Sequence, residues 1–439
     1  MAWKRWTVLG VVVVATVGCA AVGDFASDDP GLREAAGVFS SRFLAVSDAD
    51  MTATAYADGQ LEPFEGAGDE LILIENGAVT ATIAASNSVI SWPQVVDATP
   101  DGRFAVVVET RGPAPAGLEA YDSVYTDFPV GETVSVYAVD EGALRLTDTV
   151  SGVGENMQSV DIAPNGQVVI ATETPGAELV TAQISEAGEM VDVASHDLSP
   201  PYRDDDAERR IRTIHIASDG VTLAANVANR RVQFYRLSGD GVAPMGRPTE
   251  DLGSRLAVGK WTPDGEFFVV TDTNWADGTL HMLTQGPGAL TAIRPPTTGA
   301  GAPLITGRVS VGRSPEGMGM SPDGTRIATI NMERTYLPDL PFLAAWQGRR
   351  EYSVSLVSID PETGAMAELD RAYTAGILPE DVIFDAAGEN LAVAVFHRRK
   401  GADRLRGFID FYSIEGDTLA RQDVTQPVMR GAHDLVRLP

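Results

Sequence analysis

The tetrapeptide Thr99-Pro100-Asp101-Gly102 carries the strongest structural signal in this chain of 439 residues, because a turn of this kind occurs six times. Each copy follows an apolar stretch, ends in glycine and precedes an alternating strand. Proline presets φ at the first corner of such a turn, and Asp, Asn and Gly accept its left-handed corner. Each copy therefore predicts a hairpin between two strands, called a and b. The other copies are Ala163–Gly166, Ala217–Gly220, Thr262–Gly265, Ser321–Gly324 and Asp385–Gly388.

A second hairpin follows each strand b. Val134–Val139 and Leu144–Val150, for example, are apolar runs separated by Glu141-Gly142. These runs are called strands c and d, so each unit is a four-stranded antiparallel sheet of the kind that forms a propeller blade. The other second hairpins are expected to turn at Gly188, Gly239–Gly241, Gly286–Gly288, Thr363-Gly364 and Gly416-Asp417.

The two ends of the chain supply a seventh unit. Phe43–Ser47, Leu71–Glu75 and Val79–Ala84 have the pattern of strands b, c and d, and His433–Leu438 has the pattern of a lone strand a. Pairing the last strand with the first three closes a ring and removes exposed sheet edges. The sequence therefore predicts an all-β, seven-bladed β-propeller over residues 39–439, in which the C-terminal strand joins the N-terminal blade.

The a–b turns resemble those of the lactonase-like, YVTN-repeat propellers, over roughly residues 40–439. No Trp-Asp dipeptide ends a strand c, as it does in WD-repeat propellers, and the tryptophan docking repeat of quinoprotein propellers is absent. The resemblance implies a hydrolase in which an arginine-histidine pair at the start of a strand a helps to hold the substrate. Arg212 occupies the arginine position, but Thr213 stands where the histidine would be, and His433 of a neighbouring blade is the possible replacement.

The N-terminus has the layout of a secretory signal: Lys4 and Arg5 precede an apolar run from Val8 to Val17 that is too short to anchor in a bilayer. Thr16-Val17-Gly18-Cys19 resembles the lipobox of bacterial lipoproteins, although a larger aliphatic residue is usual in place of Thr16. We expect residues 1–18 to be a signal peptide, Cys19 to be lipidated and residues 19–38 to form a flexible tether. Ordinary cleavage nearby is the alternative. Either pathway predicts an exported protein of the periplasm or cell envelope.

The amino-acid composition argues against several classes of binding partner and cofactor. The net charge of −28 disfavours nucleic acid and anionic membranes, so membrane contact is expected only through the N-terminal lipid. Cys19 is the only cysteine, which leaves no disulfide framework and no cysteine metal cluster. Five histidines without paired spacing argue against a zinc site, and no glycine-rich phosphate loop is present. We expect no cofactor and a monomeric protein.

Counting from the turn glycines identifies one face of the propeller, because strands a begin and strands b end on the side opposite the a–b turns. The positions eight residues before each glycine, with His433 aligned as the seventh, are Gln94, Gln158, Arg212, Ala257, Glu316, Glu380 and His433. The positions seven residues after each glycine, with Asp48 in the closing blade, are Glu109, Glu173, Val227, Asp272, Asn331, Val395 and Asp48.

Long connections are expected on the same face, where binding residues tend to concentrate. These connections are Ala49–Gly68, Arg111–Gly131, His196–Arg210, Arg294–Gly312, Arg334–Arg350 and His397–Gly407. Their large aromatic residues either bind a ligand or pack the loops against the scaffold. Those residues are Tyr121, Tyr125, Phe128, Trp275, Tyr336, Phe342 and Trp346.

Three functions fit a polar ring beneath aromatic loops, although any seven-bladed ring has polar side chains at its channel mouth. The sequence favours binding of a small polar ligand or an envelope protein without catalysis. The alternative is a lactonase-like hydrolase of a sugar lactone or similar cyclic ester, for which no catalytic residue can be assigned. A Ca²⁺ site is the third, but its carboxylates would be spread over several blades. The candidate binding residues are Glu109, Glu173, Arg212, Asp272, Glu316, Asn331, Glu380 and His433.

Overall fold

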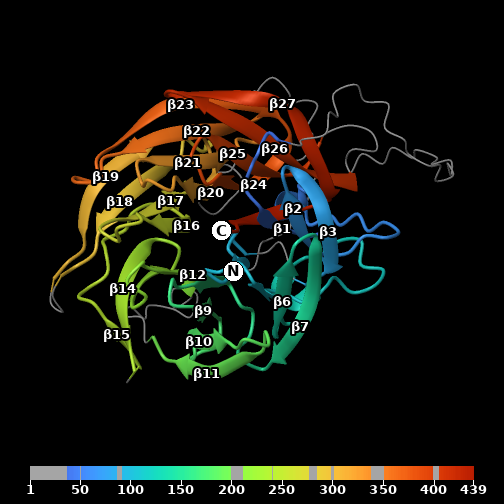
Figure 1. The fold of residues 1–439 in the computed structure, drawn as a ribbon, viewed down its shortest axis with the longest axis horizontal. Coiled ribbons are helices and arrows are strands. Elements are labelled where there is room, and N and C mark those ends of the chain that lie inside the picture. The colour runs from blue at the N-terminus through green and yellow to red at the C-terminus, as the bar shows by residue number, and fades with distance from the viewer. Residues whose placement is uncertain are drawn as a thin grey trace.

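Seven four-stranded antiparallel sheets surround a central axis in the computed structural model (Figure 1), as the repeat predicts. Strands β12, β16, β20 and β24 lie near the centre, whereas β11, β15, β19 and β23 lie at the periphery (Figure 1). The structure describes residues 37–49, 51–86, 91–198, 211–239, 241–275, 284–297, 301–337, 351–398 and 405–439.

The strands of each blade follow one another in sequence from the inside of the ring outwards, except in the blade that joins the two ends of the chain. Blade 1 contains β28 (Ala432–Arg437), β1 (Phe43–Ser47), β2 (Glu70–Glu75) and β3 (Ala78–Ala84). Blades 2 and 3 contain β4 (Val96–Ala98), β5 (Phe104–Val108), β6 (Thr133–Asp140), β7 (Ala143–Ser151), β8 (Ser159–Ile162), β9 (Gln167–Ala171), β10 (Leu179–Ile184) and β11 (Met190–His196). Blades 4 and 5 contain β12 (Ile211–Ile216), β13 (Thr222–Val227), β14 (Arg231–Ser238), β15 (Gly241–Pro244), β16 (Leu256–Trp261), β17 (Phe268–Asp272), β18 (Ala289–Arg294) and β19 (Leu304–Ser310). Blades 6 and 7 contain β20 (Pro315–Met320), β21 (Arg326–Asn331), β22 (Glu351–Ile359), β23 (Met366–Ala375), β24 (Ile377–Phe384), β25 (Asn390–His397), β26 (Arg406–Glu415) and β27 (Thr418–Met429).

The ring closes through the C-terminal strand, as predicted. β28 pairs antiparallel with β1, so that Leu44 faces Val436. The rings of Phe39 and Phe43 meet edge to face at 5.2 Å, and Phe39 lies 5.9 Å from Phe411 of blade 7. The closing blade therefore shares a buried apolar core with its neighbour.

All six predicted a–b turns are present, and the glycine of each has a positive φ, for example +68° at Gly102. A side chain closes three of the turns in the same way: Thr99 Oγ1 donates to Asp101 at 2.7 Å, and Thr262 and Ser321 donate to the matching aspartates at 2.6 Å. The repeated sequence thus encodes a repeated local structure.

Blade 5 departs from the prediction. Its strand c is β18, so Gly286–Gly288 lies in the connection before that strand and not in the c–d turn. Arg294–Gly312 was expected to be a long loop, yet it contains β19, the strand d of this blade. Close packing explains the misleading glycine at 288, since a Cβ there would lie 2.5 Å from the Asp272 carbonyl oxygen.

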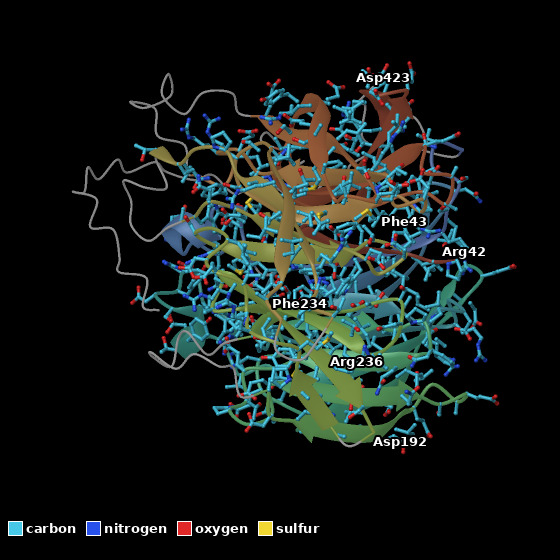
Figure 2. All side chains as sticks on the ribbon, turned by 90° about the vertical axis from the view of Figure 1, so that its left-hand side faces the viewer. Arg42, Phe43, Asp192, Phe234, Arg236 and Asp423 are labelled. Atoms are coloured by element: carbon cyan, nitrogen blue, oxygen red, sulfur yellow. The ribbon has the colours of Figure 1, made fainter. Side chains whose placement is uncertain are left out.

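The core lies between neighbouring sheets, so most strands are buried on both faces. Phe43 and Phe234 have no exposed surface, whereas Arg236 is exposed and Asp192 and Asp423 extend outward at the periphery (Figure 2). Lateral packing of this kind holds the innermost strands in a closed ring around the channel.

Side chains on the innermost strands also link successive blades. Asp434 Oδ2 accepts the backbone N–H groups of Val95 and Val96 at 2.6 and 2.9 Å. Further links of the same form join Asp97 to Ile162, Asp161 to Ile216, His215 to Gly259 and Asp381 to Leu435. The region around the axis that the innermost strands enclose is called the channel. Its end where these strands begin is called the loop-side end, and the end where they meet the a–b turns is called the turn-side end.

The described residues include two helices, α1 (Ala55–Asp58) and α2 (Val124–Asp127), both in connections on the loop side. No helix in the described part of the chain is long and apolar enough to cross a membrane. The predicted signal peptide and Cys19 lie outside the described residues.

Candidate functional site

The ring of residues selected by the glycine count lies at the loop-side end of the channel. Gln94 and Gln158 precede β4 and β8, and Arg212 is the second residue of β12. Glu316, Glu380 and His433 belong to β20, β24 and β28, whose members contact one another in blades 6, 7 and 1. The ring therefore has an acidic and imidazole side opposite a side that carries an arginine.

Glu316, Glu380 and His433 form a cluster that is closed off from solvent, with exposed fractions of 2%, 0% and 0%. Nδ1 of His433 lies 3.8 Å from Oε2 of Glu380, beyond hydrogen-bond distance. Among the described residues, both ring nitrogens of His433, both carboxyl oxygens of Glu380 and Oε2 of Glu316 lack a hydrogen-bond partner. Buried polar atoms are nearly always paired, so these unpaired atoms make the cluster the candidate site.

The surroundings favour the uncharged form of each member. Burial raises the pKa of the Glu380 carboxyl well above its usual range, and the nearby Asp48 carboxylate adds to this effect. Burial also raises the pKa of Glu316, together with the charges of Glu380 and Asp381. Burial lowers the pKa of the His433 imidazole, although two carboxylates and the Trp92 backbone oppose this effect. The cluster can therefore donate protons from its carboxyls and accept one on its imidazole.

Arg212 lies in a second polar assembly, between blades 3 and 4. Its guanidinium donates to Oε1 of Glu173 at 3.0 Å and to Oε1 of Gln158 at 2.9 Å. Arg111 lies 3.5 Å from Oε2 of the same glutamate, and its guanidinium stacks over the Tyr125 ring at 4.3 Å. Two guanidinium groups thus share the Glu173 carboxylate, so the arginine implied by the resemblance is already bonded within the protein.

The remaining candidates have structural partners. Glu109 accepts hydrogen bonds from Ser86 Oγ at 2.6 Å and from the backbone of Glu132. Oδ1 of Asp272 accepts three backbone N–H groups from its own loop region, and Asn331 donates to two serines of β22. These three side chains hold connections in place. Within the described residues, no three of the carboxylates, cysteines or histidines come together as a metal-binding group.

Described loop segments pack together at the loop-side end of the channel. Tyr121, Phe128 and Tyr336 pack in one apolar cluster with residues of α1, the 332–337 segment and β24. The Tyr121 hydroxyl donates to the Ala55 carbonyl oxygen at 2.9 Å, and Trp275 stacks near Tyr336 at 5.5 Å. These aromatics pack the loops down, which is one of the two roles expected for them. Phe342 and Trp346 lie outside the described residues.

Several residues at the channel escape prediction from sequence. His215 accepts the Gly259 N–H on one ring nitrogen, and its other ring nitrogen lies 3.0 Å from Nε2 of Gln94, two blades away. Arg111 and the linking aspartates were not selected either. The glycine count could have found four of these channel residues at a second position. Asp97, Asp161, His215 and Lys260 all stand five residues before a turn glycine.

No known protein family and no curated protein matches the sequence. Among solved structures, a proposed 6-phosphogluconolactonase of Bacteroides fragilis aligns with a TM-score of 0.56 at 16% identity, covering 91% of this chain and 98% of that one. The periplasmic gluconolactonase of Pseudomonas aeruginosa aligns with a TM-score of 0.56 at 15% identity, over 91% and 99% of the chains. A functionally unknown protein of Desulfotomaculum acetoxidans gives 0.58 at 10% identity, over 91% and 99%.

These similarities concern the fold, because identity is low throughout. The chain is a seven-bladed β-propeller. It has the fold of lactonase-like propellers, as the resemblance of the a–b turns implies.

Proposed function

We propose that this protein binds a small, uncharged, hydroxyl-rich molecule at the loop-side end of its channel. The observation that supports this proposal is the cluster of Glu316, Glu380 and His433, whose buried polar atoms lack hydrogen-bond partners among the described residues. Leaving such atoms unpaired costs roughly 1–3 kcal/mol each, so a ligand that pairs with them gains that free energy on binding.

The charge of the ligand follows from its surroundings. The nearby Asp48 carboxylate disfavours an anion, and the fold favours the uncharged forms of Glu316 and Glu380. Hydroxyl groups match such a site because each can both donate and accept a hydrogen bond. A neutral sugar lactone therefore fits better than a sugar acid or a phosphorylated sugar.

Hydrolysis of a sugar lactone is a second candidate, supported by the pairing of an imidazole with a carboxyl group 3.8 Å away. General base and general acid catalysis need these two groups in these protonation states. The fold likeness to a periplasmic gluconolactonase points in the same direction.

The hydrolytic step can be written with the residues present. His433 accepts a proton from a water molecule as the water oxygen attacks the lactone carbonyl carbon. Glu380 donates its proton to the ring oxygen as the bond between that oxygen and the carbonyl carbon breaks, which gives an open hydroxy acid. The proton on His433 then returns to Glu380 through a water molecule or a product hydroxyl group that bridges the 3.8 Å between them, and the resting state is restored.

Two probes separate binding from hydrolysis. D-glucono-δ-lactam is an amide and resists hydrolysis, so its titration by calorimetry measures binding alone. Release of acid from D-glucono-δ-lactone, followed in a pH-stat against the uncatalysed rate, measures hydrolysis. The proposal expects the lactam to bind more tightly than gluconate. Equal binding of both, or of neither, contradicts it.

We also propose that the protein is exported and anchored to the cell envelope through lipid on Cys19, on the basis of its N-terminal sequence. In a bacterium with lipoprotein processing, the wild type should fractionate with membranes and a Cys19→Ser variant should not. If both forms fractionate as soluble protein, the lipid anchor is wrong.

A further inference from the structure

Exposure changes along the innermost strands from one end of the channel to the other. At the loop-side end, eight residues before the turn glycines, Glu316 and Glu380 are 2% and 0% exposed. Three residues further along these strands, Asp97 and Asp161 are partly exposed, and Lys260 is exposed. Carboxyl groups of four other blades, from Asp97, Asp161, Asp381 and Asp434, act on the Lys260 ammonium, so its exposed surface faces the space inside the ring. Among these described residues, the turn-side end is therefore the more open to solvent.

At the opposite end, two of the described connections pack together. The 51–61 and 114–128 segments are joined by backbone hydrogen bonds from Leu61 to Glu119 and from Tyr121 to Gly59, both 2.9 Å long. Side chains of these segments pack with Phe396 and Leu378 in one buried cluster. Opening this side would expose that apolar surface and break those bonds, which costs free energy that the more open side does not require.

Resting on the proposed binding site, we propose that small molecules reach Glu316, Glu380 and His433 from the turn-side end, past Lys260, and not through the loops. Lys260 is the movable part of this passage. The carboxylates around it, from Asp97, Asp161, Asp381 and Asp434, are fixed by hydrogen bonds to backbone N–H groups. A lysine side chain, in contrast, has a long flexible stem.

The passage also selects by charge. Four carboxyl groups act on the Lys260 ammonium; burial lowers its pKa, but these four groups outweigh burial and raise it. Burial raises the pKa of each of these four carboxyl groups, so the passage carries less negative charge than four carboxylates would, and a neutral molecule only has to displace the lysine. The passage thus favours the same uncharged class of ligand as the site does.

Thiol accessibility tests this route without any ligand. A Glu316→Cys variant in a Cys19→Ser background carries one thiol, placed at the loop-side end. Its rate of reaction with a small neutral methanethiosulfonate reagent reports access from solvent. Adding Lys260→Trp should slow this reaction strongly. Adding Tyr121→Ala, which loosens the loops, should leave the rate unchanged.

A second variant keeps the experiment informative if the Lys260→Trp substitution disturbs folding. Lys260→Met removes the positive charge without adding bulk, so the ratio of the rates for cationic and anionic reagents should rise. The route is wrong if Tyr121→Ala speeds the reaction while both Lys260 variants leave the rates and their ratio unchanged. Failure of the binding site itself is seen separately, as absence of lactam binding to the wild type.

Discussion

Both ends of the channel carry carboxyl groups, but the hydrogen bonding of these groups differs between the two ends. Nearer the turn-side end, Asp434 and Asp161 accept backbone N–H groups of the next blade, and each bond ties two blades together. At the loop-side end, Glu380 and Glu316 are buried but leave carboxyl oxygens without partners among the described residues. A buried carboxyl that is paired contributes to the fold, and one that is unpaired weakens it. We therefore expect changes at the paired aspartates to lower stability and changes at the loop-side cluster to lower binding.

The largest effect is expected at the turn-side end, from Asp434→Ala. This change leaves the N–H groups of Val95 and Val96 unpaired where the ring closes. Loss of about 2–5 kcal/mol of unfolding free energy is expected from two such groups. Urea unfolding measures the loss, and Asp434→Asn, which keeps an accepting oxygen, is the control. If the alanine and asparagine variants are equally stable, the link between blades is unimportant.

At the loop-side end, substitutions are expected to weaken binding without lowering stability. Glu380→Gln and His433→Phe should each weaken lactam binding by about 100-fold, as is usual when a buried polar contact is lost. Their thermal midpoints should be unchanged or higher, because each replaces an unpaired titratable group. Glu109→Gln is the matched control, since Glu109 already has protein partners and should keep full binding. Loss of stability in the first two variants without loss of binding would contradict this expectation.

A smaller effect is expected at the turn glycines. A Cβ at Gly102 would lie 2.7 Å from the ring of Pro439, in addition to the strain of a φ of +68°. Gly102→Ala should cost about 1–2 kcal/mol of unfolding free energy. At Gly416, φ is +65° but a Cβ would meet nothing within 4 Å, so Gly416→Ala measures the backbone strain alone. Equal losses from both would mean that the contact with the C-terminal residue adds nothing.

The smallest effect is a dependence of stability on pH. The raised pKa values of Glu316 and Glu380 mean that the folded protein holds protons that the unfolded chain releases above its ordinary pKa of 4.5. Stability should therefore fall as pH rises through that value towards the folded pKa values. Between about pH 5 and about pH 8, the thermal midpoint of the wild type should fall more than that of a Glu316→Gln, Glu380→Gln double variant. Parallel curves would show that these carboxyls ionise freely.

Local sequence predicts the repeated parts of this molecule well. The a–b turns are encoded by four adjacent residues, and ring closure follows from counting strands. Blade 5 shows the limit, because Gly288 is required by a close approach to Asp272 and Gly307 by one to Gly364. Both glycines look like turn residues, but each is explained by a contact between segments distant in sequence.

The candidate site was predictable in position but not in chemistry. The same glycine count that selects Glu380 and His433 also selects Glu109 and Asp272, because register gives the end of a strand and nothing about its neighbours. Whether a carboxyl is paired depends on groups such as the Glu132 backbone, which the fold alone brings near. The links between blades were missed for the same reason.

A crystal structure of the protein soaked with D-glucono-δ-lactam tests the central claim most directly. We predict electron density for the lactam at the loop-side end of the channel, with its hydroxyl groups within hydrogen-bond distance of Glu316, Glu380 and His433. Density for the lactam only on the outer surface of the loops, or around Lys260 with the cluster unoccupied, would contradict the claim.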